Sequence, residues 1–255
     1  MSGPLLSIVM ASYNAERLIA ASIDSVIGQT LKDWELIIVD DASIDATVDV
    51  IADAQRRDHR IRLVAQDTNR GPAHARNVAL DRASGELIAF IDSDDIWYPE
   101  KTVKQVAVMN RHRADIAYTA YKRRLDGEQG GTLVTVPERV TYRTMLRRNY
   151  IACSTAMVRR STCGEARMPE IPLRADHGYW LALLRDGSRS AIGIREPLMW
   201  YRLHRDSLSA NKLVAARYSW KLLREVERFG LAKSLWLFSG YAFEALKLRL
   251  VASTR

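Results

Sequence analysis

Three aspartates stand within four positions of the stretch FIDSDDIWYPEK, residues 90–101. Asp92 and Asp94 are separated by one residue, and carboxylates at this spacing can converge on Mg²⁺ or Mn²⁺, which prefer oxygen ligands. Because two acids seldom complete a magnesium site, a phosphate-bearing partner would have to supply further ligands. The alternative is an acidic turn that stabilises the start of a helix near Pro99. The third acid, Asp95, has no assigned role beyond capping that helix.

The segments around this cluster alternate between apolar strand patterns and amphipathic helix patterns. Strands are expected at residues 5–12, 34–41, 61–66, 86–95 and 115–121, and helices at about 15–29, 43–57, 72–83 and 99–111. Continuous apolar strands alternating with helices indicate a mostly parallel sheet covered on both faces, a Rossmann-like α/β fold.

Polar side chains follow three of these strands at the point where each strand ends. They are Ser12, Tyr13 and Asn14 after the first, Asp40 and Asp41 after the second, and the Asp92–Asp95 cluster after the fourth. Ligands of such sheets bind beyond the carboxyl ends of the strands, so these side chains are expected to form one site. This placement favours a metal site over a capped turn.

Glycine-rich phosphate loops are absent from the sequence. Neither G-x-G-x-x-G nor G-x-x-x-x-G-K-[ST] follows the first strand. A nucleotide bound at this edge would therefore need its phosphates neutralised in another way, and metal-bound aspartates would do so.

The second half has a looser pattern. It is expected to contain an exposed loop at 122–131, an edge strand at 132–136, helices at 142–148 and 176–185, a strand near 198–203, and two C-terminal helical segments, the second at about 232–251.

Composition restricts the class of protein. Hydrophobic residues make up 47% and charged residues 27% of the 255 residues, as in a globular protein with a substantial core. Two cysteines, Cys153 and Cys163, indicate neither a disulfide framework nor a cysteine zinc site. The start lacks the features of a secretory signal, and no apolar run approaches the roughly 20 residues of a membrane span. A cytoplasmic protein is expected.

The net charge of +8 is concentrated near the C-terminus. Residues 201–255 contain eleven Lys/Arg and four Asp/Glu. This basic, aromatic-rich segment could lie on an anionic membrane surface as amphipathic helices, or pack against the rest of the chain or a partner. No nucleic-acid recognition motif accompanies the charge, so nucleic-acid binding is not expected.

Several ordered motifs carry a family resemblance. They are SIVMASYNAERLIAASIDSVIGQT, ELIIVDDASIDATVDVI, NRGPAHARNVALDRASGELIAFIDSDDIWYPEK, ADHGYWLALLRDG and YRLHRDSLS. In this order, and nearly continuous from Leu6 to Lys101, they resemble the family 2 glycosyltransferases of the GT-A fold.

The resemblance implies roles for individual residues. The nucleotide sugar would be bound by Ala11, Ser12, Tyr13, Asn14, Asp40, Arg76, Asp92, Ser93 and Asp94. Within that set Asp40 would hydrogen-bond the uracil ring, and Asp92 and Asp94 match the DXD pair that holds Mn²⁺ or Mg²⁺. His204 matches a position near the metal or the diphosphate.

Asp176 matches the catalytic base of the family. Ala175 precedes it here in place of the commoner Glu, which removes a neighbour that often orients the acceptor. The alternative role of Asp176 is to cap the helix that follows. Trp97 and Trp180 could stack on sugar faces or pack in the core.

Together these assignments predict an inverting, metal-dependent glycosyltransferase of bacterial polysaccharide biosynthesis. It would use a UDP-sugar donor and a glycan or lipid-linked saccharide acceptor. The expected domains are a GT-A domain at 1–209, with a nucleotide-sugar half (1–121) and an acceptor half (122–209), and a basic helical segment at 210–255 with peripheral membrane contact. The alternatives are a nucleotidyltransferase and a non-catalytic nucleotide-sugar-binding protein.

Overall fold

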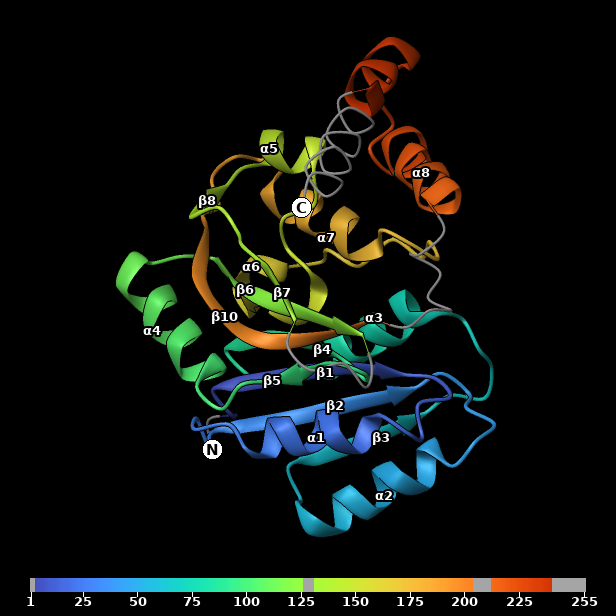
Figure 1. The fold of residues 1–255 in the computed structure, drawn as a ribbon, viewed down its shortest axis with the longest axis vertical. Coiled ribbons are helices and arrows are strands. Elements are labelled where there is room, and N and C mark those ends of the chain that lie inside the picture. The colour runs from blue at the N-terminus through green and yellow to red at the C-terminus, as the bar shows by residue number, and fades with distance from the viewer. Residues whose placement is uncertain (1–2, 126–130, 204–211, 240–255) are drawn as a thin grey trace.

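The computed structural model describes residues 3–125, 131–203 and 212–239 of the chain (Figure 1). The first half contains β1 (Leu6–Ser12), α1 (Ile19–Ile27), β2 (Trp34–Asp40), α2 (Thr47–Arg57), β3 (Ile61–Ala65), α3 (Pro72–Arg82), β4 (Leu87–Asp92), β5 (Ile96–Trp97), α4 (Lys101–His112) and β6 (Ile116–Leu125). The second half contains β7 (Thr132–Val134), β8 (Arg139–Val140), α5 (Tyr142–Arg147), a 3-10 turn (Cys153–Thr155), β9 (Met157–Arg159), α6 (Arg160–Cys163), α7 (Ala175–Leu184), β10 (Ala191–Leu203) and α8 (Lys212–Lys221). A π-helical turn (Leu222–Val226) continues α8, and residues 231–239 form a further helix.

One twisted sheet runs through most of the described chain. Its strand order is β3-β2-β1-β4-β9-β6-β10-β5, with β7 added to β6 and β8 added to β10. The strands β3, β2, β1 and β4 are parallel, as are β6 and β10, whereas β9 is antiparallel to both of its neighbours. The predicted α/β class is confirmed. The three-residue strand β9, which joins the two parallel sets, was not predicted because so short a segment carries no periodicity.

The two faces of the sheet have separate cores. Alternate residues of β1 and β4 point to opposite faces. Ile8 and Met10 pack with α1 and α2 on one side, and Val9 and Phe90 pack with α3 and α7 on the other. The ring of Phe90 meets the ring of Trp180 edge-on, with centroids 5.5 Å apart. Helices on both faces fix the sheet, and with it the strand ends that carry the polar residues.

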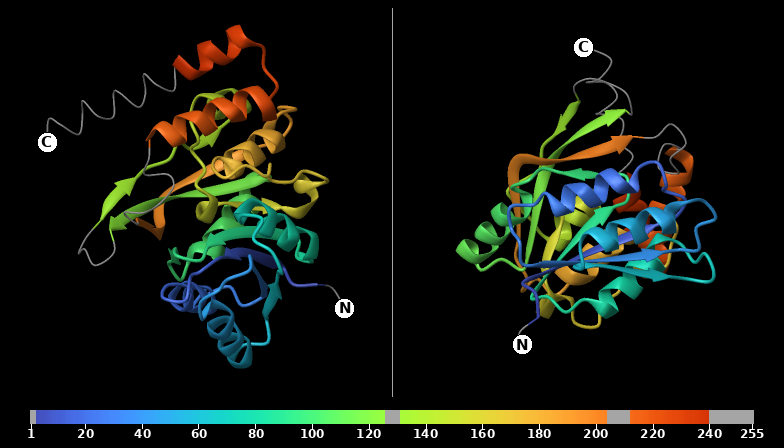
Figure 2. Two further views of the ribbon diagram at one scale, coloured as in Figure 1. Left: turned by 90° about the vertical axis from the view of Figure 1, so that its right-hand side faces the viewer. Right: turned by 90° about the horizontal axis from the view of Figure 1, so that it is seen from below.

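The C-terminal helices lie at one end of the molecule. In Figures 1 and 2, α8 and the helix at 231–239 are at the opposite end from α2. No helix among the described residues has both the length and the apolarity needed to cross a membrane. The part of the predicted helix 232–251 beyond residue 239 lies outside the described residues.

Candidate functional site

A cavity of about 990 Å³ opens at the carboxyl ends of β1, β2 and β4. Of the residues predicted to bind the nucleotide sugar, all but one line it: Ala11, Ser12, Tyr13, Asn14, Arg76, Asp92, Ser93 and Asp94. Asp40 and Asp176 are not among its lining residues, and His204 lies outside the described residues. The sheet therefore brings together side chains that are up to 83 positions apart in the sequence.

Asp40 lies beneath the cavity and is 1% exposed. Its Oδ1 accepts hydrogen bonds from the hydroxyls of Ser12 (3.0 Å) and Ser43 (2.6 Å), and its Oδ2 accepts one from the main-chain N–H of Ser43 (2.8 Å). These bonds tie the end of β1 to the turn after β2. In this structure the Asp40 carboxylate is hydrogen-bonded to Ser12 and Ser43 and does not line the cavity.

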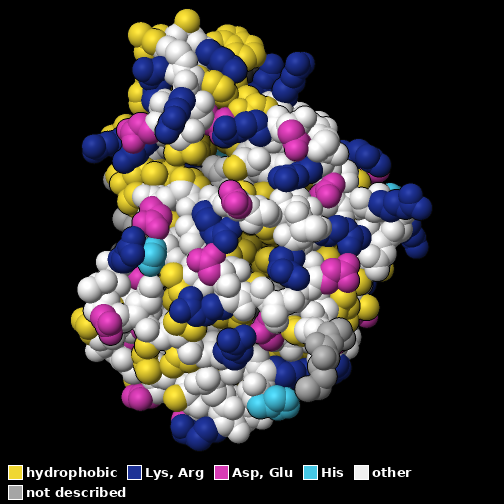
Figure 3. Space-filling view, turned by 180° about the vertical axis from the view of Figure 1, so that it is seen from behind, with side chains coloured by type: hydrophobic (Ala, Val, Ile, Leu, Met, Phe, Trp, Pro, Cys, Tyr) yellow, Lys and Arg dark blue, Asp and Glu magenta, His cyan; other side chains and the backbone are white. Residues whose placement is uncertain are grey.

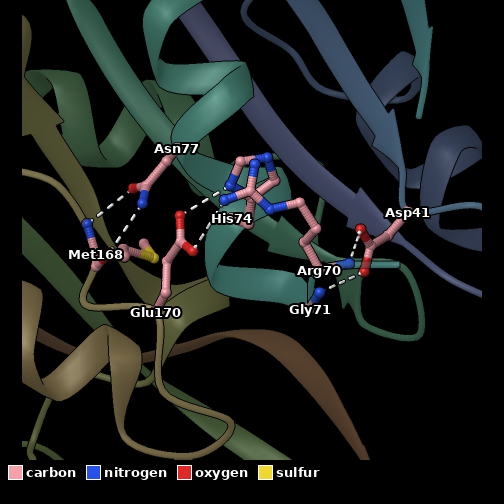
Figure 4. Close-up of polar contacts among 7 residues, drawn as sticks. All are labelled: Asp41, Arg70, Gly71, His74, Asn77, Met168 and Glu170. Carbon is pink, nitrogen blue, oxygen red and sulfur yellow. Dashed lines mark hydrogen bonds and ion pairs between the residues drawn. The ribbon is translucent and has the colours of Figure 1, made fainter. Parts of the chain in front are cut away.

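Asp41 lines the cavity, and its carboxylate holds the loop before α3 (Figure 4). It accepts the main-chain N–H groups of Arg70 (2.9 Å) and Gly71 (2.7 Å). Gly71 has a φ of 90°, in the left-handed region that favours glycine, so this position suits the loop geometry that presents both N–H groups. Asp41 was expected at the sheet edge from its position after the second strand, but it was not among the predicted binding residues.

Asp92, Asp94 and Asp95 have carboxylate oxygens within 4.8 Å of one another. Asp92 Oδ1 accepts a hydrogen bond of 2.5 Å from the guanidinium of Arg76, which is 12% exposed. Burial opposes the charge on Arg76, whereas Cys153, Asp92 and Asp176 raise its pKa above the ordinary value. Like charges this close are unfavourable unless a cation compensates them.

Asp95 is fully buried and belongs to the carboxylate cluster rather than to a helix cap. Its Oδ1 accepts the main-chain N–H of Arg202 at 3.1 Å, and its Oδ2 is buried and has no hydrogen-bond partner among the described residues. Burial raises its pKa well above the ordinary value, and the charges of Asp92 and Asp94 raise it further. The helix α4 begins at Lys101 and has no side-chain cap, so the capping role considered for Asp95 is wrong. The buried Oδ2 of Asp95 beside the carboxylates of Asp92 and Asp94 is the arrangement expected of residues that bind a cation.

Asp176 lies in the first turn of α7 and is partly buried. Its Oδ2 accepts a hydrogen bond of 3.0 Å from the side-chain amide of Asn149. The residue that precedes the helix is Arg174, and no side chain caps the helix start. The capping alternative for Asp176 is therefore wrong. The residue that orients it, Asn149, was not found from the sequence because it lies in the irregular stretch without periodicity.

Trp97 and Trp180 are core residues and do not reach the cavity. They are 2% and 0% exposed, and their indole N–H groups donate to the carbonyls of Ser154 (2.9 Å) and Ile151 (3.0 Å). Of the two roles considered for them, core packing is the one the structure supports.

The segment between α6 and α7 closes one side of the cavity and is fastened to α3 (Figure 4). Glu170 lines the cavity and accepts from His74 Nδ1 (2.8 Å) and Arg70 Nη2 (3.4 Å). Asn77 makes reciprocal hydrogen bonds with the main chain of Met168, at 2.9 and 2.8 Å. These contacts join residues more than 90 positions apart, so no local pattern could have revealed them.

A comparison with known families identifies the class of protein to which this fold belongs. The model of "Glycosyl transferase family 2" matches residues 7–164. The chain belongs to glycosyltransferase family 2, as the motifs predicted. This result favours a glycosyltransferase over the two alternatives considered, a nucleotidyltransferase and a non-catalytic binding protein.

Two curated relatives match over nearly their whole length. The putative teichuronic acid biosynthesis glycosyltransferase TuaG of Bacillus subtilis is 40% identical over 248 residues, which is 97% of this chain and 98% of TuaG. The UDP-Glc:alpha-D-GlcNAc-diphosphoundecaprenol beta-1,3-glucosyltransferase WfgD of Escherichia coli is 36% identical over 239 residues, which is 94% of this chain and 93% of WfgD.

Solved structures share the fold. Staphylococcus aureus TarS 1-349 in complex with UDP-GlcNAc aligns with a TM-score of 0.72 and 21% identity, over 93% of this chain and 71% of that chain. The mannosyltransferase PcManGT of Pyrobaculum calidifontis, in complex with GDP-Man and Mn²⁺, aligns with a TM-score of 0.70 and 19% identity, over 98% and 76%. The predicted GT-A architecture is confirmed.

Proposed function

We propose that this enzyme transfers a sugar, with inversion, from a UDP-sugar to a hydroxyl of a glycan or lipid-linked saccharide in the assembly of a bacterial surface polysaccharide. The observation that carries the proposal is that Tyr13, Asp41, Asp92 and Asp94 line one cavity, with Asp95 buried beside the last two. The relatives TuaG and WfgD, which bear names of this kind, support the setting and the donor class.

The nucleoside would be bound between the end of β1 and the loop held by Asp41. Tyr13 is 49% exposed and lines the cavity, so its ring is available for stacking on a base. Asp41 uses each carboxylate oxygen once within the protein, and each oxygen has a further lone pair for an N–H of the base. We therefore assign the base-binding role to Asp41, and to Asp40 the support of the segment Ser12–Asn14.

A divalent cation, Mn²⁺ or Mg²⁺, would be held by Asp92 and Asp94. The fit rests on the crowding of their oxygens and on the Oδ2 of Asp95, which is buried and has no hydrogen-bond partner within the described part of the chain. When bound, the metal supplies positive charge for the leaving diphosphate. The chain contributes the guanidinium of Arg76, which lines the cavity and donates a hydrogen bond to the Asp92 carboxylate. His204 stays a predicted contact of the metal or the diphosphate.

Asp176 is proposed as the base that removes the proton of the acceptor hydroxyl. A base for this step must be ionised and fixed in direction before the acceptor arrives. The hydrogen bond from Asn149 occupies one lone pair of Oδ2 and leaves Oδ1 for the proton. Inversion follows because a base on the acceptor side directs attack opposite to the leaving diphosphate.

The enzyme would work in the cytoplasm, with peripheral contact to the inner face of the membrane. The basic segment 210–255 and the diphosphoundecaprenol in the name of WfgD support this setting. The domain limits 1–209 and 210–255 stay a prediction.

Calorimetry of UDP binding tests the site directly. Wild-type protein should bind UDP more tightly with Mn²⁺ than with EDTA, and Asp94→Ala should remove this difference while unfolding at the wild-type temperature. Arg82→Ala, on the exposed end of α3, serves as a control that keeps metal-dependent binding. Unchanged metal dependence in Asp94→Ala would refute the metal site.

A further inference from the structure

A second hollow of about 500 Å³ lies between α5 and the helix at 231–239, away from the donor cavity. Its lining combines basic side chains with apolar ones: Arg143, Arg147, Lys233, Leu146, Trp236 and Leu237. None of the described residues that line it is acidic. We call this hollow the α5 groove.

The helix at 231–239 exposes an apolar stripe beside the groove. Leu231, Leu235 and Trp236 are 58%, 53% and 61% exposed. Leu231 and Leu235 are four positions apart and so are neighbours on the helix surface, and Trp236 lies further around the same exposed half of the helix. The opposite side is already packed, since Leu237 is 4% exposed and Phe238 meets Trp220 edge-on at 5.6 Å. The helix is therefore apolar on the packed side and on the exposed side as well.

The cations around this stripe have no acidic partner within the part of the chain that the structure describes. Arg143, Arg147 and Lys233 are exposed and form no ion pair there. The guanidinium of Arg147 lies 5.4 Å from the ring centroid of Trp236, and Lys233 Nζ lies 3.6 Å from that of Phe229. Figure 3 shows apolar and basic side chains gathered at the end of the molecule that the C-terminal helices form.

The exposed apolar stripe and the exposed cations together match the chemistry of a bilayer that contains anionic lipids. A protein partner for an apolar stripe would be expected to bury it against an apolar face, which leaves the three cations without a counter-charge. A bilayer that contains anionic lipids satisfies both parts, because phosphates meet the cations while leucine and tryptophan enter the interface. Tryptophan is favoured at this depth because its ring is apolar and its N–H is polar.

We infer that the α5 groove and the stripe Leu231–Leu235–Trp236 form a membrane-docking surface, with Arg143, Arg147 and Lys233 binding lipid phosphates. The inference rests on the proposed function in that it gives the membrane contact a defined surface. It extends that contact to α5, which lies outside the basic segment 210–255. The docked enzyme would present α5 towards the membrane, and α5 packs against α7, which carries the proposed base Asp176.

Vesicle binding of the full chain tests this surface. Protein is sedimented with vesicles of phosphatidylcholine alone or of phosphatidylcholine mixed with phosphatidylglycerol. The wild type should partition onto the mixed vesicles and much less onto the neutral ones. Arg143→Gln with Arg147→Gln should bind the mixed vesicles about 30-fold more weakly, since each basic side chain near an anionic surface contributes roughly 1 kcal/mol.

A charge-matched control separates the groove from net charge. Arg82→Gln with Arg111→Gln removes two exposed cations from the ends of α3 and α4 and should keep most of the binding. Equal losses in the two double variants would overturn the inference, as would equal binding of wild type to both kinds of vesicle.

Insertion of the stripe is measured separately. Lipids brominated near the headgroup should quench part of the tryptophan fluorescence of the wild type, and Trp236→Phe should lose that quenched part while still binding. Quenching unchanged in Trp236→Phe would contradict insertion at this helix. UDP calorimetry without vesicles tests the donor site alone, so failure of the docking surface and failure of the proposed function give different results.

Discussion

Asp40 and Asp41, at the end of β2, make different contacts. Successive side chains of an extended segment point to opposite sides. Asp40 points inward to Ser12 and Ser43, and Asp41 lines the cavity and holds the N–H groups of Arg70 and Gly71. The sequence places both acids at the sheet edge, but only their hydrogen bonds distinguish them. For Asp95, too, the sequence leaves the role open, and its burial in the structure shows that it is not a helix-capping residue.

Asp41→Asn should weaken UDP binding about tenfold, because asparagine has one acceptor oxygen in place of two and hydrogen bonds to a charged group contribute about 1.5–3 kcal/mol. Asp40→Asn should instead lower the free energy of unfolding by about 1–3 kcal/mol, the usual cost of an unsatisfied buried group. Calorimetry and chemical denaturation of both variants check this. Loss of affinity only in Asp40→Asn would reverse the assignment.

Asp176→Asn should keep UDP binding and lose transfer, with kcat reduced by at least about 100-fold, because a positioned base contributes typically 10²–10⁴-fold. Asn149→Ala should show a smaller loss of kcat, since the carboxylate remains but is no longer oriented. Turnover by Asp176→Asn close to that of the wild type would remove Asp176 as the base.

At the scale of elements, the segment from Gly164 to Arg174 matters because it carries a cavity wall and leads directly into α7 and Asp176. Contacts of two kinds, ion pairs and amide hydrogen bonds, fasten it to α3. The ion pairs of Glu170 are half-exposed, whereas the two hydrogen bonds between Asn77 and Met168 are partly buried. Solvent-exposed ion pairs contribute about 0–1 kcal/mol to stability. The hydrogen bonds between Asn77 and Met168 should therefore stabilise this segment more than the ion pairs of Glu170 do.

Asn77→Ala should therefore lower the free energy of unfolding by about 1–2 kcal/mol and speed proteolysis within residues 164–174, because two main-chain groups of Met168 lose their partner. Glu170→Gln should change stability by less than about 1 kcal/mol. Denaturation curves and limited proteolysis of both variants measure this order. A larger loss in Glu170→Gln would show that the ion pairs hold the segment.

At the scale of the whole molecule, the parallel sets of the sheet are joined by a short antiparallel strand, and each face has its own core. β6 extends from Ile116 to Leu125 and so crosses the predicted boundary at residue 121 between the two halves. Buried polar residues connect the layers. His177 of α7 is buried, and its Nε2 lies 2.7 Å from the carbonyl of Met145 in α5.

Acid should destabilise the fold through His177. Burial lowers its pKa from 6.5 to about 4, against the raising effects of the Met145 carbonyl and Asp176. The unfolded chain thus binds more protons between these values. The contribution to the free energy of unfolding should be constant above about pH 6.5, fall by up to about 3 kcal/mol as the pH drops to about 4, and level off below.

His177→Gln is the matched variant, because its amide can still donate to the Met145 carbonyl but does not titrate. The free energy of unfolding of both proteins is measured from pH 8 to 4. The wild type should lose more stability in acid than the variant, so the difference between the two proteins should be smaller at pH 4 than at pH 8. Parallel curves would mean that His177 titrates with an ordinary pKa.

The sequence by itself determined the α/β class, the family and the edge of the sheet at which chemistry occurs. Alternating apolar and amphipathic segments are local signals, and the family motifs span contiguous residues. It also placed eight cavity-lining residues, from Ala11 to Asp94, because the ends of parallel strands must share one edge.

Only the tertiary structure decided which carboxylate faces the cavity, which amide orients Asp176, and what fastens the wall of the cavity. The contacts Asp41–Gly71, Asn149–Asp176 and His74–Glu170 link residues 27 to 96 positions apart. Such contacts depend on packing across layers, which leaves no period in the sequence. The α5 groove has the same origin, since α5 and the helix at 231–239 meet only in the folded chain.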